Sequence, residues 1–158
     1  MKKAFAVLLL LLVISYIVQA KGWKGITPLH STCEDVKRAL GVDSCTLPMS
    51  NYTLPDFRVV VFFSKNRDCD ADARDWRVPA GTVTSLVVSP RNEMLPSELG
   101  IDVSKFKSLG QGDVVGTEGY DNRDEGVEIH LFKGFIQYVV FYPPSNKEKL
   151  RCKPMKSP

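Results

Sequence analysis

The sequence predicts an α+β fold in which short helices pack on an antiparallel sheet. Three observations predict it: a capped helical pattern at residues 32–40, short runs rich in β-branched and aromatic residues, and a run at 127–132 in which apolar and polar side chains alternate. Residues 21–158 are expected to form a single exported domain. Its halves, 21–92 and 93–158, share a plan of a short helix, a polar connection and two strands. Either a true repeat or chance would produce this likeness between the halves.

The first twenty residues predict a secretory signal peptide and are left out of the fold. Lys2 and Lys3 precede an uncharged run, 4–20, that ends in small residues at Val18 and Ala20. The alternative is an uncleaved anchor, for which this run is at the short limit. Cleavage after Ala20 leaves 138 of the 158 residues and lowers the formal charge from +3 to +1, since two lysines are removed. A chain so close to neutral lacks the basic surface of a nucleic-acid-binding protein, and it has no second apolar stretch long enough to span a bilayer.

The first half begins with the predicted helix, 32–40. Ser31 and Glu34 fit a capping box, because the side chain of each can bond the backbone N–H of the other. Gly41 favours the left-handed conformation that ends a helix. One face of the helix is apolar, and its members are Cys33, Val36 and Leu40.

Strands are predicted where β-branched and aromatic residues are dense. Runs 57–63 and 82–89 have this composition, and 114–117 is a shorter candidate. The alternating run 127–132 fits a strand with one buried face, and a tight turn at 133–134 makes 135–142 its partner.

The remaining segments carry weaker patterns. Residues 96–109 show a weak helical pattern, and 66–81 is a polar, turn-rich stretch that is expected to be a long hairpin connection around Trp76. Residues 146–156 are expected to be a lysine-rich tail held by Cys152.

The mature chain contains four cysteines, which predict two disulfides in an oxidising compartment. They are Cys33, Cys45, Cys69 and Cys152, and their spacings of 12, 24 and 83 residues differ from the close pairs of a zinc site. Three pairings are open. The preferred pairing is Cys45–Cys69, because these residues flank one predicted strand and its turns, and it leaves Cys33 for Cys152.

Several motifs resemble those of a group of secreted bacterial proteins to which no function is assigned. The match covers most of the mature chain. It comprises Thr27-Pro28-Leu29-His30-Ser31-Thr32, Glu34-Asp35-Val36, Leu40-Gly41, Trp76-Arg77-Val78-Pro79, Thr82-Val83, Asp124-Glu125-Gly126-Val127 and Leu150-Arg151-Cys152.

More distantly, the polar helix start followed by Val36, Leu40-Gly41 and strands resembles two families. They are the small outer-membrane lipoprotein of the β-barrel assembly machinery (SmpA/OmlA) and the β-lactamase-inhibitor proteins. This resemblance implies a helix layer on an antiparallel sheet that is used for protein binding. The chain departs from the lipoprotein because it lacks the anchoring cysteine and has Pro28-Leu29 where a glycine is usual. Likeness of fold does not by itself establish function.

Few residues are candidates for chemistry. His30 lies three residues before Cys33, a spacing that allows a thiol–imidazole pair, although a helix-start neighbour and a disulfide partner are the simpler interpretation. His130 is expected on the outer face of its strand, exposed or in contact with a partner. Trp76, Tyr52, Tyr120 and Tyr142 are candidates for a recognition surface or for packing.

An acidic cluster in the polar connection is the one candidate metal site. Asp68, Asp70 and Asp72 have the alternate spacing of a calcium loop, and Asp75 follows them. The rest of the loop does not match, because Ala73 occupies the position that needs glycine and Pro79 the position that needs glutamate. A solvated acidic loop is therefore the expected structure, with no metal or cofactor.

The sequence as a whole favours an exported, non-enzymatic binding or adaptor protein, secreted or periplasmic. Its partner would be another envelope or secreted protein and not a nucleic acid, and no membrane span is expected after signal cleavage. The alternative is a small secreted hydrolase. A pocket that brought His30 or His130 beside a carboxylate and a nucleophile would favour the hydrolase, and a broad open sheet face would favour binding.

Export is directly testable. Intact-mass measurement of the secreted product should show Lys21 as its first residue, because cleavage is expected after Ala20. Recovery of the full-length chain in the membrane fraction alone would instead identify the N-terminal segment as an anchor.

Overall fold

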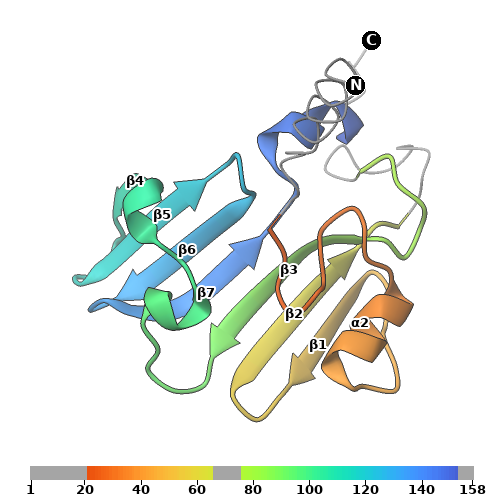
Figure 1. Cartoon of the computed structure of the whole chain (residues 1–158), viewed down its shortest axis with the longest axis horizontal. Coiled ribbons are helices and arrows are strands. Elements are labelled where there is room, and N and C mark those ends of the chain that lie inside the picture. The colour runs from red at the N-terminus through yellow and green to blue at the C-terminus, as the bar shows by residue number, and fades with distance from the viewer. Residues whose placement is uncertain (1–20, 66–75, 153–158) are drawn as a thin grey trace, which may run out of the picture.

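Seven antiparallel strands form one open sheet in the computed structural model, which describes residues 21–65 and 76–152 (Figure 1). The spatial order is β1-β2-β3-β7-β6-β5-β4. The strand bounds are β1 Met49–Thr53, β2 Phe57–Phe63, β3 Val83–Pro90, β4 Lys107–Gln111, β5 Thr117–Asn122, β6 Val127–Phe132 and β7 Phe135–Phe141.

The helical part is smaller than an α+β fold suggests. Within residues 21–65 and 76–152 it consists of the helix α2, Cys33–Leu40, and three 3-10 turns, η1 Pro96–Leu99, η2 Val103–Lys105 and η3 Ser145–Leu150. The predicted antiparallel sheet is confirmed, and the fold is mostly β with a minor helical component. Among the described residues, no helix has both the length and the apolar character needed to cross a membrane.

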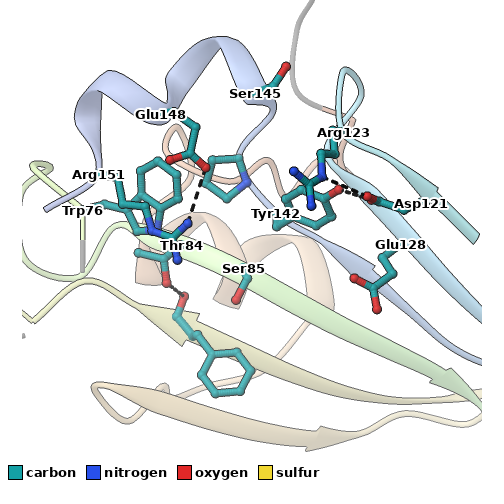
Figure 2. Close-up of a pocket in the computed structure, with 12 residues that line it drawn as sticks. Trp76, Thr84, Ser85, Asp121, Arg123, Glu128, Tyr142, Ser145, Glu148 and Arg151 are labelled. Atoms are coloured by element: carbon teal, nitrogen blue, oxygen red, sulfur yellow. Dashed lines mark hydrogen bonds and ion pairs between the residues drawn. The ribbon is translucent and has the colours of Figure 1, made fainter. Parts of the chain in front are cut away.

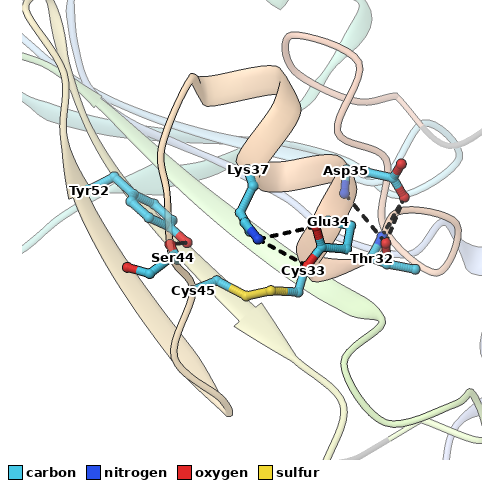
Figure 3. Close-up of polar contacts among 8 residues, drawn as sticks. All are labelled: Thr32, Cys33, Glu34, Asp35, Lys37, Ser44, Cys45 and Tyr52. Carbon is cyan, nitrogen blue, oxygen red and sulfur yellow. Dashed lines mark hydrogen bonds and ion pairs between the residues drawn. A yellow bond between two sulfur atoms is a disulfide. The ribbon is translucent and has the colours of Figure 1, made fainter.

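Helix α2 has the predicted extent, but its capping box lies one residue later than expected. Thr32 accepts a hydrogen bond from the backbone N–H of Asp35, and Asp35 accepts one from the backbone N–H of Thr32 (Figure 3). Ser31 is buried instead, and its hydroxyl accepts a hydrogen bond from the backbone of Thr27 at 2.9 Å. Gly41 ends the helix in the left-handed conformation, as predicted.

The predicted strands with the strongest composition are confirmed within a residue, namely β2, β3, β6 and β7. The weak pattern at 96–109 does not form an α-helix. Gly100 adopts a left-handed conformation after η1, so the chain makes two separate 3-10 turns and then enters β4. Residues 114–116 form a turn, and the strand starts at Thr117. The sequence patterns missed β1, β4 and β5.

Each half of the sequence contributes one side of the sheet. Strands β1–β3 form one meander and β4–β7 another, and the last strands of the two meanders pair with each other. In that pairing Val87 faces Val140, with Leu86 opposite Phe141 and Val88 opposite Val139. The predicted plan of one helix and two strands in each half is not reproduced, because the described halves contain three and four strands and the second has 3-10 turns in place of the helix. Their origin as a repeat stays a prediction.

One face of the sheet is covered and is called the inner face. Helix α2 and the turns η1 and η2 lie over it (Figure 1). Alternate residues of the central strands are buried there together with Val36 of α2 and with Trp23 and Ile26 of the first segment. The strand residues of this core are Val59, Val61, Phe63, Val83, Leu86, Val88, Val127, Ile129, Leu131, Ile136, Val139 and Phe141.

A disulfide joins Cys33 at the start of α2 to Cys45 in the segment before β1 (Figure 3). The preferred pairing of Cys45 with Cys69 and of Cys33 with Cys152 is therefore wrong. The chain turns back after α2, which brings the two Cα atoms within 6.1 Å across a separation of 12 residues. Closing a loop of this size stabilises a domain by about 3 kcal/mol. Cys152 is also disulfide-bonded, and Cys69 lies outside the described residues.

Gly126, in the turn between β5 and β6, has no room for a side chain. Its φ is 69°, and an added Cβ would overlap the carbonyl oxygen of Tyr142. We expect Gly126→Ala to lower the free energy of unfolding by about 2–4 kcal/mol, through backbone strain and steric overlap together. The measurement is urea denaturation.

The matched control is Gly134→Ala in the β6–β7 turn. Gly134 also has a positive φ, 85°, but nothing lies within 4 Å of the added Cβ. Strain alone should then cost about 1–2 kcal/mol. Equal losses in the two variants would show that the turn at Gly126 relaxes and that the overlap has no consequence.

Candidate functional site

The face of the sheet opposite α2 is called the outer face, and no helix or turn of the described chain covers its centre. Three valines lie in register across its centre, Val60 on β2, Val87 on β3 and Val140 on β7. Each is half-buried, whereas its strand neighbours on the inner face are fully buried. Phe62, two residues beyond Val60, is 37% exposed. The centre of the outer face is therefore apolar and accessible.

A cleft of about 630 Å³ lies at one end of the outer face (Figure 2). Strand residues contribute its floor, which includes Phe62, Ser85, Asp121 and Glu128. Tyr142 and Pro143, just after β7, extend this floor beyond the end of the strand. The turn η3 and Trp76 form the wall on the other side, and Ser145, Glu148 and Arg151 line it.

The cleft contains a polar cluster centred on Asp121. Tyr142 donates its hydroxyl hydrogen to Asp121, and the Arg123 Nε lies 3.2 Å from the Asp121 Oδ2. The Asp121 side chain is only 10% exposed, so these two donors compensate the loss of water around its charge. Burial raises the pKa of Tyr142 far above its usual value, and the hydrogen bond to Asp121 raises that pKa further.

The wall of the cleft is fastened to the segment that contains Trp76. Trp76 pairs with Arg151 in a short antiparallel bridge, and the Arg77 N–H donates to the Leu150 carbonyl at 2.8 Å. The guanidinium of Arg151 lies 5.9 Å from the centre of the Trp76 ring and also contacts Glu148 at 3.4 Å. Trp76 is 9% exposed and therefore acts mainly as a buried support for the wall.

Glu128 lines the cleft and contacts His130, two residues further along β6. The Nε2 of His130 lies 2.5 Å from its Oε1, and the imidazole stacks on Tyr138 with ring centres 4.4 Å apart. Burial raises the pKa of Tyr138, and the charge of Glu128 adds to that effect. Within the described residues, no serine, threonine or cysteine hydrogen-bonds to Glu128 or His130.

The structure separates the two histidines that the sequence singled out. His30 is exposed in the turn before α2, and the disulfide engages the sulfur of Cys33, so these residues do not form a thiol–imidazole pair. His130 lies on the outer face, as expected for the alternating strand 127–132.

The other candidates have different outcomes. Trp76 and Tyr142 both line the cleft, whereas Tyr52 and Tyr120 pack at the edge of the core. Asp68, Asp70, Asp72 and Asp75 lie outside the described residues. In the part of the chain that the structure describes, no three potential metal ligands come together.

Sequence reasoning missed the acidic and basic residues of the cleft. Asp121 and Glu128 face each other across the β5–β6 ladder, and Arg123 follows β5. The alternation of 127–132 placed Glu128 on the polar face, but the register that brings Asp121 beside it depends on a strand that the sequence did not predict.

Comparison with protein-family models, with curated proteins and with solved structures gives no match. The resemblances found in the sequence motifs therefore stay predictions, and the site is interpreted from its own geometry.

The hydrogen bond between Tyr142 and Asp121 can be tested by Tyr142→Phe. We expect a loss of about 1–3 kcal/mol in the free energy of unfolding, because a largely buried carboxylate loses a donor. Tyr52→Phe is the matched control, since its hydroxyl donates to the Ser44 carbonyl at an exposed site. Urea denaturation of both variants should show the larger loss for Tyr142→Phe.

The same variant should change the dependence of stability on alkaline pH. Because the pKa of Tyr142 is raised in the folded state, the unfolded state loses this proton first as the pH passes about 10. The contribution of the protonated Tyr142 phenol to the free energy of unfolding is thus fully present below about pH 10 and decreases above it. The decrease should be smaller in Tyr142→Phe; an identical alkaline profile would contradict the assigned shift.

Proposed function

We propose that this protein is exported and binds another envelope or secreted protein through the outer face of its sheet. The observation that carries the proposal is the row of Val60, Val87 and Val140, which lies in register on three central strands with no covering element in the described chain. An apolar centre of this kind, surrounded by polar groups, is typical of a protein-binding surface.

The margins of the outer face support this proposal. At one side Glu128, His130 and Tyr138 form a half-buried polar and aromatic group, and at the other Met49 is 43% exposed beside Phe62. Aromatic residues and methionine are enriched in interfaces, and the aromatic ones bury a large area for little loss of side-chain entropy.

Export is supported by the cysteines. The disulfide between Cys33 and Cys45 fits an oxidising compartment outside the cytoplasm, which agrees with the predicted signal peptide. Secretion and periplasmic residence are both compatible with it. The alternative of a secreted hydrolase gains no support from the pair of His130 and Glu128, because neither residue hydrogen-bonds to a serine, threonine or cysteine among the described residues.

A substitution at the centre of the valine row tests the proposal. We expect the wild-type secreted protein to capture a partner from its own envelope or medium by cross-linking, and Val87→Glu to lose that partner. Val87→Thr is a second variant that keeps the side-chain volume, and it should weaken capture while the fold is retained. Thermal melting of each variant checks folding.

Val115→Glu is the matched control, since Val115 is 93% exposed in the turn between β4 and β5. Capture by this variant should equal that of the wild type. A partner that binds equally well to folded Val87→Glu or Val87→Thr would show that the outer face is not the binding surface.

A further inference from the structure

We propose that the cleft at the end of the outer face receives a basic side chain, lysine or arginine, of the bound protein, with Glu128 as the opposing charge. This inference rests on the proposed function, because it assigns the chemistry of one contact within the same docking surface. The carboxylate in question, Glu128, lines the cleft on the outer face and is partly exposed to solvent (Figure 2).

The balance of charges in the cleft points to a cation. Arg123 is paired with Asp121, and Arg151 is paired with Glu148, so each arginine of the cleft already has a carboxylate. Glu128 is the third carboxylate. Its one hydrogen-bond partner in the described residues is His130, which carries a charge only when protonated. Among the described residues that line it, the cleft therefore has one carboxylate more than it has permanent cations.

Glu128 is also free to make a second contact. The hydrogen bond to His130 uses its Oε1, and within the described chain no donor is bound to Oε2. Its side chain is 35% exposed, which is enough for a ligand to reach it and little enough to limit screening by solvent. A charge-assisted hydrogen bond to an ammonium or guanidinium group would occupy this oxygen.

The shape of the cleft suits the long apolar stem of a basic side chain. Ser85 lies in register with Phe62 and, being small, leaves the floor open between the rings of Phe62 and Tyr142. Figure 2 shows Ser85 and Glu128 on either side of Tyr142 in this view. A lysine or arginine stem can pack against the rings while its charged end reaches Glu128, and the faces of the rings attract the cation as well.

Titration with single blocked amino acids tests the proposal without knowledge of the partner. The isotope-labelled secreted protein is titrated with the Nα-acetyl methylamides of arginine and lysine, and backbone and indole NMR signals are followed. We expect saturable shifts at Glu128, Ser85 and Trp76. The matched probes are the methylamides of citrulline, a neutral analogue of arginine, and of glutamate, and neither should shift these signals at the same concentration.

Two variants locate the charge. Glu128→Gln keeps the side-chain volume and should weaken binding of the basic probes about tenfold or more, as expected for loss of a charge-assisted hydrogen bond. Glu93→Gln is the control, because Glu93 is exposed in the segment after β3 and does not line the cleft. Equal binding to Glu128→Gln, equal binding of citrulline, a preference for glutamate, or no saturable shift with either basic probe would each overturn the proposal.

The result separates this inference from the proposed function. If a captured partner depends on Val87 but Glu128→Gln does not weaken its binding and the basic probes do not bind, the outer face is a docking surface and the assignment of a basic contact is wrong. If the basic probes bind through Glu128 while no captured protein depends on Val87, the cleft is a site for a small cation and the docking proposal fails.

Discussion

The pairing of β3 with β7 is the interaction on which the rest of this structure depends. It joins two meanders of consecutive strands. No other strand pair of the described sheet links the two meanders. Leu86, Val88, Val139 and Phe141 place their side chains in the core from this one ladder, and all are buried. The alternate residues Val87 and Val140 necessarily point to the outer face. The same register therefore determines both the centre of the core and the centre of the proposed binding surface.

This double role explains what the sequence could and could not predict about the sheet. The run around Val59 is apolar at nearly every position, and the run around Val87 mixes valine and leucine with threonine and serine without regular alternation. Composition therefore identified both as strands but did not show which face is covered. Strands β4 and β5 were missed because they contain Gly110 and Gly119 and few β-branched residues. They are strands because their neighbours supply hydrogen-bond partners, and a local pattern does not contain that information.

At the helix start and in the candidate site, the local sequence pattern again did not determine which residues become partners. Ser31 and Thr32 are adjacent hydroxyl residues followed by the adjacent carboxylates Glu34 and Asp35, so two capping boxes were equally compatible with the pattern. Burial of Ser31 decided between them. In the cleft, Trp76 and Tyr142 could be singled out as aromatic residues. The partnership of Tyr142 with Asp121 could not, because it spans 21 residues and requires the register of three strands.

The end of β7 has a consequence for the shape of the whole outer face. Pro143 and Pro144 follow the strand after a single residue, Tyr142; both are buried, and neither has an N–H to offer to a neighbouring strand. The sheet ladder stops at this point, and the chain leaves the plane of the sheet to form η3, which stands beside the outer face as a rim. A residue type known for ending strands thus gives an otherwise open surface a concave corner. The cleft lies where two successive prolines prevent the chain from continuing the sheet ladder.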